Sequence, residues 1–362
     1  MKKKILYVFR TPRNHILIDT KKGLVPNSML FGLNHLREFG YQVDFFDYSY
    51  SLLNFFHPLL YPFEHAIIDQ VGMGFKLDQA TALLPKIHQY DVIVCTGDSA
   101  GLPFLFYKYL GIIRKPIILL SSALAGALRT HMDSWVINFY KKIIPSVDVM
   151  TVYAEIEKEF FVEKFGMPPE KIIHIPYGTD WNFFSKKNTR EKTIISAVGV
   201  DSLRDYDTFF KAVRNLSEKV VVACHPDNVK GLIIPKNVAC EFLVPPQRVR
   251  DIFNQSKLVV VPCKEKLRGS GHMVVLEALS AARPVIVSKI KGMTSAFSLE
   301  DKKHLLYAKP HNPSALTFAI KSILKNQRAA DRMGQRGSLL VKNQYTSYHL
   351  AINIDRILKS VL

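Results

Sequence analysis

Four consecutive residues, Ser270, Gly271, His272 and Met273, have the pattern of an anion-binding site. They follow Gly269 and open the apolar run HMVVLEALSAA, whose spacing predicts a helix. Glycines allow a ligand to approach the backbone closely, and the free amides at the start of a helix attract phosphate. We therefore expect the amides of these four residues to bind the phosphate of a ligand.

Glu277 is the one carboxylate in this predicted helix, and the other residues from 274 to 279 are apolar. A carboxylate that is shielded from water needs a hydrogen-bond partner. The hydroxyls of a ribose are suitable donors, whereas the alternative is a solvated glutamate on the helix surface. The apolar setting favours the ribose contact.

A basic residue follows another predicted strand, TIISAVGV (193–200). The strand ends at Gly199, and the loop after it delivers Arg204 next to the start of a helix. A guanidinium beside a helix start is well placed to hold a pyrophosphate. The alternative is a surface ion pair of Arg204 with Asp205 or Asp207. Anion sites after two strands of one parallel sheet can converge on a single nucleotide, so the two segments are expected to form one site.

The first half of the chain offers candidates at predicted strand ends. Asp98, in CTGDSAG, could contact the hydroxyls of an acceptor. His131, in ALRTHMDSW, could hydrogen-bond and orient a donor sugar, although a lone histidine is more often structural or at the surface. Similar strand-end positions are held by Gly97, Ser99, Ser121, Ser122 and, as a weaker candidate in the second half, His225.

Short apolar strands alternate with helical stretches along the chain, beginning with KILYVF (4–9). This alternation is typical of parallel sheets with crossover helices. The polar stretch KKNTREK (186–192) has the composition of a linker. We therefore predict an α/β protein with two doubly wound, Rossmann-like domains that face each other across a cleft. Their expected bounds are 1–185 and 193–345, with a C-terminal helix over 346–362 that packs on the N-terminal domain.

Residues 52–68, LLNFFHPLLYPFEHAII, are densely aromatic and contain two prolines. The simpler interpretation is a buried loop and helix of the first domain. The alternative is an exposed apolar face that docks on lipid or on a lipid-linked acceptor.

The chain of 362 residues is strongly basic, with a formal net charge of +18. Nucleic acid, an anionic membrane surface or anionic substrates could each explain this charge. The charge is spread along the chain without a nucleic-acid-binding motif, so we do not expect a nucleic-acid partner. The four cysteines are far apart and indicate buried, reduced thiols. With no signal peptide and no apolar run of ~18 residues, we expect a cytoplasmic protein, soluble or peripheral on the inner face of a membrane.

Several catalytic motifs are absent from the sequence. It contains neither GxGxxG nor the phosphate-loop lysine motif, and neither H-E-x-x-H nor G-x-S-x-G. The sequence therefore gives little support for the hypotheses that the protein is a nicotinamide oxidoreductase or a nucleoside triphosphatase.

Taken in order, several segments resemble the GT-B glycosyltransferases, and most closely the retaining glycosyltransferase family 4, or glycosyl transferases group 1. The matching segments are HIPYGTDWNFF (174–184), VGVDSLRDYDTFFKAV (198–213), VRDIFNQSKLVVVPC (249–263), SGHMVVLEALSAARPVIVS (270–288) and SILKNQRAADRMGQRGSLLVKNQYT (322–346). They cover the C-terminal half in the family's order, whereas the N-terminal half matches in outline.

The resemblance implies transfer of a sugar from a nucleoside-diphosphate sugar, with retention at the anomeric carbon. The donor would lie mostly on the C-terminal domain, with Arg204 on the diphosphate and Glu277 on the ribose. The amides of 270–273 would face the phosphate and sugar, and Phe242 to Pro245, with Val244, would flank the base. The expected catalytic residues are His131, Asp98, Arg204 and Glu277, and the expected donor-binding residues are Gly199, Arg204, Val244, Ser270, Gly271, His272, Met273 and Glu277.

The transition state of such a transfer builds negative charge on the leaving diphosphate, so cations and aimed amides matter more than a protein nucleophile. Lys264 and Arg268 are further candidates for this role. GT-B enzymes of this kind generally need no metal, so neither a metal nor a permanently bound cofactor is expected. The expected partners are the sugar-nucleotide donor, a glycan or lipid-linked acceptor of cell-surface polysaccharide synthesis, and an anionic membrane surface.

Two positions depart from the family's pattern. The second glutamate that often stands eight positions before the ribose-binding one is Gly269 here. The glycine-rich loop after the first strand is replaced by TPRNHILIDTKKGLVPNS (11–28), whose one glycine is Gly23. Both departures concern the donor sugar and the catalytic detail, while the residues expected to bind the nucleotide are present.

Two other functions fit the same fold. One is a sugar-nucleotide epimerase, for which the sequence offers no obvious pair of catalytic carboxylates. The other is a degenerate, non-catalytic glycosyltransferase-like partner, favoured by the losses at Gly269 and in the glycine-rich loop.

Overall fold

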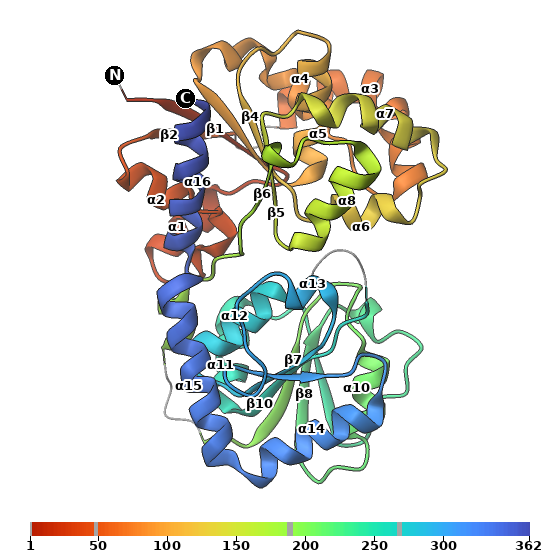
Figure 1. Cartoon of the computed structure of the whole chain (residues 1–362), viewed down its shortest axis with the longest axis vertical. Coiled ribbons are helices and arrows are strands. Elements are labelled where there is room, and N and C mark those ends of the chain that lie inside the picture. The colour runs from red at the N-terminus through yellow and green to blue at the C-terminus, as the bar shows by residue number, and fades with distance from the viewer. Residues whose placement is uncertain (1, 47–49, 187–190, 266–269) are drawn as a thin grey trace. The chain divides into compact units, whose positions relative to one another are not determined.

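The computed structural model describes residues 2–46, 50–186, 191–265 and 270–362. The chain forms two compact units, each built on a six-stranded parallel sheet (Figure 1). The first unit comprises Met1–Ile18, Leu30–Pro176 and Leu350–Leu362, and the second comprises Asp19–Met29 and Tyr177–His349. The two sheets confirm the predicted fold class, in which apolar strands alternate with helices.

The sheet of the first unit has the strand order β2-β1-β3-β4-β5-β6. Its strands are β1 (Lys4–Phe9), β2 (Gln42–Phe45), β3 (Val92–Thr96), β4 (Ile117–Leu120), β5 (Val149–Val152) and β6 (Ile172–His174). In the centre, Ile5 pairs with both Val43 and Val92. The described residues of the central strands β3, β4 and β5 are buried throughout, which explains their unbroken apolar sequences.

The helices of the first unit follow the strands in sequence. They are α1 (Asn14–Lys21), which continues into the second unit, α2 (Leu33–Glu38), α3 (Tyr50–Val71), α4 (Leu77–Leu83), α5 (Asp98–Tyr109), α6 (Leu124–Arg129), α7 (Trp135–Ile143), α8 (Glu155–Phe165) and α16 (Ser347–Val361), of which residues from Leu350 onward belong here. At the C-terminus, the hydroxyl of Tyr41 donates to Asp355 at 2.8 Å. A Cβ added to Gly32 would lie 3.1 Å from the Cα of Ala351, so α16 packs closely at the start of α2.

The sheet of the second unit has the order β12-β11-β10-β7-β8-β9. Its strands are β7 (Ile194–Val198), β8 (Lys219–Cys224), β9 (Val238–Phe242), β10 (Ser256–Val261), β11 (Val285–Ser288) and β12 (Leu306–Ala308). Its helices are α9 (Trp181–Ser185), α10 (Tyr206–Val213), α11 (Pro246–Gln255), α12 (His272–Ser280), α13 (Lys291–Thr294), α14 (Pro313–Lys325) and α15 (Gln327–Gln344). The strand order reverses between β7 and β10, and in such sheets ligands bind beyond the carboxyl ends of the strands at this reversal.

The core of the second unit lies between this sheet and the helices α10 and α14. Phe209 of α10, Val222 of β8 and Ile320 of α14 are fully buried in one cluster. This apolar layer fixes α10, and therefore the loop before it that carries Arg204, against the sheet.

The observed division of the chain differs from the predicted boundary at 186–192. It falls between Pro176 and Tyr177, because the segment after Tyr177 is bonded within the second unit. The amide of Thr179 donates to the carbonyl of Tyr345 at 2.9 Å, and the amide of Ser347 donates to Thr179 at 2.8 Å. The segment 19–29 joins the second unit as well, where the amide of Asn27 donates to Asp180 at 3.0 Å.

Two segments have local structures that the sequence pattern did not predict. The region VPNSMLFGLNHLREFG forms a short 3-10 helix, Asn27–Leu30, and then α2, because Phe31 and Gly32 both have positive φ (48° and 79°) and interrupt a single helix. The region 52–68 lies within one helix, α3, that runs through Pro58 and Pro62. Ile67 is fully buried on that helix, whereas 79% of Leu59 is exposed, so α3 has both a buried side and an exposed apolar side.

The four cysteines are free, as expected, and three of them are buried. Among the described residues, none of the helices has an apolar stretch that would let it cross a membrane.

Candidate functional site

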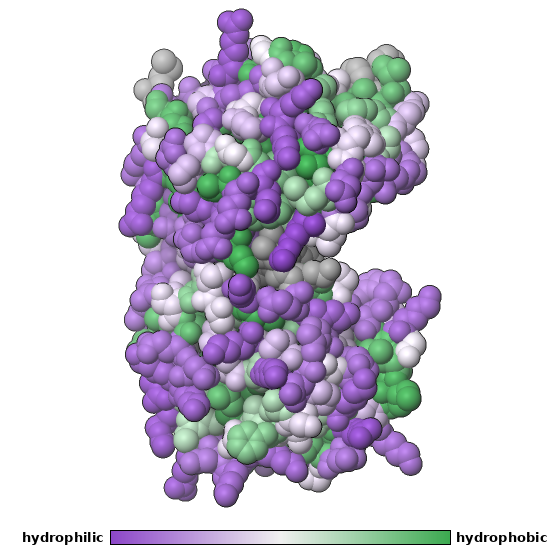
Figure 2. Space-filling model, turned by 45° about the vertical axis from the view of Figure 1, so that its right-hand side comes forward, coloured by the Kyte–Doolittle hydropathy of each residue, from purple (hydrophilic) through white to green (hydrophobic). Residues whose placement is uncertain are grey.

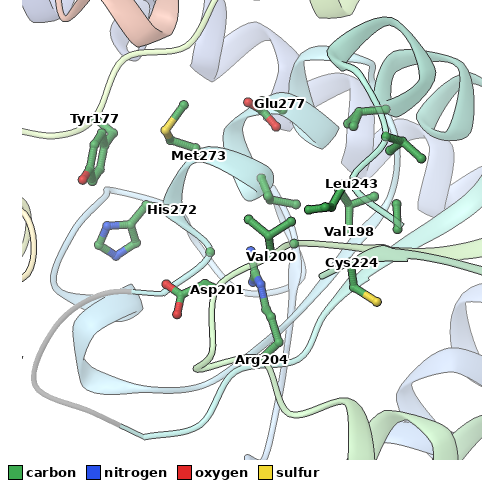
Figure 3. Close-up of a pocket in the computed structure, with 16 residues that line it drawn as sticks. Tyr177, Val198, Val200, Asp201, Arg204, Cys224, Leu243, His272, Met273 and Glu277 are labelled. Atoms are coloured by element: carbon green, nitrogen blue, oxygen red, sulfur yellow. The ribbon is translucent and has the colours of Figure 1, made fainter. Parts of the chain in front are cut away.

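A cavity of about 360 Å³ lies in the second unit at the carboxyl ends of β7 and β8 and at the start of α12 (Figure 3). Seven of the predicted donor-binding residues line it together: Gly199, Arg204, Val244, Gly271, His272, Met273 and Glu277. Its other lining residues are Tyr177, Val198, Val200, Asp201, Ala223, Cys224, Leu243, Val249 and Val274. The structure thus brings three separate segments to one cavity beside the reversal of the strand order.

Arg204 is held in this cavity by the backbone of its own loop. The amide of Asp205 donates to Pro262 at 3.0 Å and the amide of Lys264 donates to Leu203 at 2.9 Å, which joins the loop to the segment after β10. The side chain is 4% exposed, and its Nη1 donates to the Cys263 thiol sulfur at 3.4 Å. Its buried Nε has no hydrogen-bond partner within the described part of the chain. A guanidinium with an unused donor in a cavity is suited to an anionic ligand.

The alternative for Arg204, a surface ion pair with a neighbouring aspartate, does not occur. Asp205 accepts bonds from the amide and hydroxyl of Thr208, at 3.2 and 2.9 Å, and so caps α10. Asp207 pairs with Lys211, one turn along the helix, at 2.6 Å. Both carboxylates are therefore engaged away from the guanidinium.

Gly199 and Gly271 lie on two sides of the Arg204 guanidinium. A Cβ added to Gly199 would lie 2.1 Å from Nε of Arg204, and one added to Gly271 would lie 2.6 Å from Nη1. Gly271 also has a φ of +86°, which side chains other than glycine rarely adopt. At both positions, the absence of a side chain leaves room for the arginine, whereas our expectation that Gly271 lets a ligand approach the backbone stays a prediction.

A matched pair of substitutions separates the two reasons for a glycine at position 271, which are its positive φ and the lack of space for a Cβ. Gly231 has a similar φ of +77°, but a Cβ there would meet nothing within 4 Å. Gly231→Ala should therefore lower the free energy of unfolding by about 1–2 kcal/mol, the cost of the left-handed backbone. Gly271→Ala should cost about 1–3 kcal/mol more, because its Cβ overpacks Arg204 and Val261. Urea denaturation of the two variants measures the difference, and equal losses would contradict a tightly packed guanidinium.

The start of α12 is open toward the cavity. Its N-cap residue is Gly271, which has no side chain to cap the helix, and the structure records no side-chain cap. The amides of His272, Met273 and Val274 are thus the first amides of the helix, and two of them, those of His272 and Met273, are among the four that we predicted. Ser270 is 1% exposed and does not line the cavity, and its carbonyl accepts from the Cys263 thiol at 3.3 Å.

The side chain of His272 has a structural role. Its Nε2 donates to the carbonyl of Gly292 at 2.8 Å, because a carbonyl can only accept. Its ring packs edge-on against Tyr177 at 5.8 Å and Phe297 at 5.2 Å. These contacts fix the first turn of α12 and therefore the position of its first amides.

Glu277 projects from α12 into the same cavity (Figure 3). The residue is 9% exposed, and its carboxylate has no hydrogen-bond partner among the described residues. Burial raises its pKa from the ordinary 4.5 to about 7, although Arg204 acts in the opposite direction. A shielded carboxylate without a protein partner is suited to accept hydrogen bonds from ligand hydroxyls.

This raised pKa predicts that the free protein loses stability as the pH rises. The folded state binds the Glu277 proton more tightly than the unfolded state, so the penalty is absent below pH 4.5 and complete above about pH 7. The expected loss is about 3 kcal/mol in the free energy of unfolding. Urea denaturation at pH 5 and pH 8 should show this fall in the wild type and a fall smaller by that amount in Glu277→Gln. Identical pH dependence in both proteins would rule out a buried, ionising Glu277.

The opposite wall of the cavity is apolar. Val198, Ala223 and Cys224 contribute from β7 and β8, and Leu243 and Val244 contribute from the segment after β9. Leu243 has a positive φ of 50°, and its amide donates to Cys224 at 3.1 Å, which fixes this segment beside the cavity. Phe242 and Pro245, which we expected beside a base, do not line the cavity.

The first-unit candidates do not line this cavity. Asp98 is 4% exposed at the start of α5, and its Oδ2 accepts from the amides of Ser122 and Ala123 at 3.1 and 2.8 Å. Burial raises the pKa of its carboxyl group, which the bonds from Ser121 and these amides oppose. Asp98 therefore holds the loop after β4, and its contact with an acceptor stays a prediction.

His131 lies in the exposed turn after α6. Its Nδ1 is 2.8 Å from the carbonyl of Ala127 and 2.9 Å from the hydroxyl of Thr130, both within the same turn. These contacts are local, and the orientation of a sugar by His131 also stays a prediction. Of the other candidates, Lys264 does not line the cavity, and Arg268 and Gly269 lie outside the described residues.

Among the residues in or beside this cavity that the sequence analysis did not single out are Tyr177, Cys263 and Asp201. Tyr177 belongs to the segment IPYGTD, which is part of the family resemblance, so its sequence position already indicated that it could lie at the site. Cys263 was interpreted as a buried strand thiol, and nothing in its sequence context indicates a contact with Arg204. Asp201 lies on the loop between Gly199 and Arg204, where both ends were already singled out.

One group of side chains outside this cavity has the composition of a metal-ion site. His57, Glu64 and Asp78 of the first unit place ligand atoms within 4.8 Å of one another. They bond one another, since His57 Nδ1 is 3.1 Å from Asp78 and the amide of Asp78 donates to Glu64 at 2.9 Å. An Asp-x-Asp pair at 205 and 207 also occurs beside Arg204, but its two carboxylates point to different partners, as described above.

Comparison with known proteins identifies the class. Residues 179–339 match the family Glycosyl transferases group 1, a range that contains every residue lining the cavity except Tyr177. No curated protein sequence matches the chain. Sucrose-phosphate synthase from Thermosynechococcus elongatus has a similar structure, with a TM-score of 0.72, 14% identity and 99% of both chains covered.

Two further solved structures carry ligands. Anabaena HepE in complex with UDP and glucose has a TM-score of 0.70 and 12% identity, with 99% of this chain and 100% of HepE covered. A mutant of TarM from S. aureus, in complex with fondaparinux, alpha-GlcNAc-glycerol and UDP, has a TM-score of 0.60 and 14% identity, with 78% of this chain and 59% of TarM covered. These similarities define the fold.

The chain therefore has the GT-B fold of glycosyltransferases over its whole length. Residues 179–339 of its second unit match the glycosyl transferases group 1 family, in agreement with the resemblance to family 4.

Proposed function

We propose that the protein transfers a sugar, with retention, from a UDP-sugar to a hydroxyl group of a glycan or lipid-linked acceptor in cell-surface polysaccharide synthesis. One observation carries the proposal: a buried guanidinium, an uncapped helix start and an unpartnered carboxylate line the same cavity of the described chain. A nucleoside diphosphate offers the matching groups, which are phosphate oxygens for the first two and ribose hydroxyls for the third.

In this proposal the diphosphate lies between Arg204 and the first amides of α12. As the acceptor oxygen bonds to the anomeric carbon, the bond from that carbon to the β-phosphate oxygen breaks and negative charge collects on the leaving diphosphate. Donors that are already aimed at this charge stabilise the transition state without reorganisation. The departing phosphate takes the proton of the acceptor hydroxyl, and no protein nucleophile or metal ion is required.

The apolar wall formed by Val198, Ala223 and Leu243 would receive the base. None of these side chains can hydrogen-bond a base edge, so recognition would depend on size and on backbone groups. HepE and TarM were both solved with UDP, which supports uracil as the base. Asp98 and His131 of the first unit remain our proposals for contacts with the acceptor and the donor sugar.

An anionic membrane surface is proposed as a further partner. The net charge of +18 favours such a surface, and α3 exposes Leu59, Tyr61, Phe63 and Ile68 at 36–79%. On the face drawn in Figure 2, hydrophilic side chains predominate and apolar ones form separate groups. Sedimentation with vesicles that contain anionic lipid should pull down the protein, and Leu59→Glu should weaken this. If the fraction of protein bound to vesicles changes neither with salt concentration nor with this substitution, the membrane partner is not supported.

A donor screen tests the function directly. UDP-sugars at saturating concentration should raise the Tm by several degrees, also in EDTA, whereas GDP- and ADP-sugars should have smaller effects. Product analysis by NMR with an α-linked donor should give an α-linked product. If no sugar nucleotide shifts the Tm, the proposed function is wrong, and a β-linked product would exclude retention.

A further inference from the structure

A second cavity, of about 340 Å³, lies in the second unit among α14, α15 and the residues before and within β12. It shares no lining residue with the first cavity. Figure 1 shows α14 and α15 meeting at a corner of this unit. We propose that this cavity binds a phosphate group that carries an apolar chain, separately from the sugar-nucleotide donor.

The rim of the cavity is positively charged and lacks a neutralising group. Lys302, Arg332 and Arg336 line it, and none of its described lining residues is acidic. Arg332 and Arg336 are four residues apart and therefore lie on the same face of α15. Three cations around one cavity attract an anion, and guanidinium groups match the oxygens of a phosphate.

Of the acidic residues close to the rim in sequence, Asp331 and Glu300 pair with other cations, while Asp301, next to Lys302, accepts from the backbone amide of Tyr307. Asp331 accepts from Lys192 at 2.9 Å, and Glu300 pairs with Lys303 at 2.6 Å. Within the described part of the chain, Lys302 and Arg332 have no side-chain hydrogen bond or ion pair. Arg336 donates from Nε to the carbonyl of Lys303 at 2.9 Å, which holds this guanidinium at the rim.

The backbone at Lys302 is held in a rare conformation. Its φ is +59°, in a region that side chains other than glycine seldom adopt. The amide of Lys302 donates to Leu305 at 2.7 Å, and Asp301 accepts from the amide of Tyr307 at 2.8 Å. The turn that presents Lys302 is therefore fixed, and costly backbone conformations of this kind are concentrated at ligand-binding positions.

The floor of the cavity is apolar. Ile323 of α14 is 6% exposed, and Ala330 and Met333 of α15 are each 5% exposed, with Leu306 of β12 beside them. A free phosphate would use the rim but not this floor. A cationic rim above an apolar floor fits an amphipathic anion, such as a lipid phosphate, while a soluble phosphate ester is the other source of the same head group.

Calorimetry on the full chain distinguishes these sources with two probes. Dihexanoyl phosphatidic acid, used below its micellar concentration, presents a phosphate and short acyl chains, whereas glycerol 3-phosphate presents the phosphate without the chains. We expect the lipid to bind at least about tenfold more tightly, because each buried methylene group strengthens binding. Equal affinities would overturn the amphipathic ligand.

Charge reversal on the rim provides the matched test. Arg332→Glu/Arg336→Glu should weaken binding of the lipid by about tenfold or more. The control, Lys321→Glu/Arg328→Glu, makes the same change of charge on α14 and α15 at exposed residues that do not line the cavity. An equal loss in the control, or no loss in the rim variant, would overturn the site.

Two further measurements separate the loss of lipid binding at this cavity from a folding defect and from a failure of the proposed function. Arg332→Gln/Arg336→Gln removes the charge without reversing it, and should weaken lipid binding even if the reversed variant folds poorly. UDP binding should be unchanged in the rim variants, because they share no lining residue with the donor cavity. Loss of UDP binding together with lipid binding would show a disturbed fold rather than a second site.

Discussion

Glu277→Gln is expected to lower kcat/KM for sugar transfer by about 100-fold or more. In our account the carboxylate accepts a hydrogen bond from each of two ribose hydroxyls, and each charge-assisted bond is worth about 1.5–3 kcal/mol. The amide of glutamine keeps the shape but not the charge. A steady-state assay with the donor found in the screen measures the change.

The same variant should be more stable than the wild type at pH 8. Burial raises the pKa of Glu277 to about 7, so at pH 8 the wild type carries a buried negative charge that glutamine does not. Lower activity with higher stability is the pattern of a functional residue, whereas a structural glutamate would lose both. Glu241→Gln is the control, since Glu241 pairs with Arg248 outside the cavity. A Glu277→Gln enzyme with normal activity would contradict the proposed contact between Glu277 and the ribose.

Arg204→Met is expected to weaken UDP binding by about 10- to 100-fold. Methionine fills part of the space between Gly199 and Gly271 but cannot donate to phosphate, and a charge-assisted bond is worth about 1.5–3 kcal/mol. Arg204→Lys should lose less, because it keeps the charge without the fork of donors. Isothermal titration with UDP measures both variants.

The control for Arg204 lies at the other end of the same helix. Arg214 is exposed at the C-terminal end of α10, so Arg214→Met changes the same net charge without touching the cavity. Its UDP affinity should equal that of the wild type. If Arg204→Met also binds UDP normally, the guanidinium does not contact the phosphates.

The sequence predicted the two sheets well because their central strands, such as β3, β4, β5 and β7, are buried throughout. VIVC of β3 and LVVV of β10 are unbroken apolar runs, as expected for strands that are covered on both faces of a parallel sheet. The same logic located the site, since Gly199 directly follows β7, and Glu277 lies on α12, the helix that comes after β10. Glu277 was identifiable because a carboxylate among apolar residues of a helix is shielded from water and therefore needs a hydrogen-bond partner.

Other features depend on contacts that sequence spacing does not encode. The role of Gly271 comes from the guanidinium of Arg204, which is 67 positions away in the chain and reaches it through the fold. Likewise, Phe31 and Gly32 separate the 3-10 helix Asn27–Leu30 from α2 through their positive φ, and phenylalanine gives no sign of that conformation. The short strand β12 has only three residues, too few for a periodic pattern.

The most direct test of the account is a crystal structure of the chain with UDP. We predict the diphosphate at the amides of His272 to Val274 and within hydrogen-bond distance of Arg204. The ribose hydroxyls should donate to Glu277, and the uracil should lie against Leu243 and Val244. UDP bound elsewhere, or bound in this cavity with the ribose away from Glu277, would contradict the account.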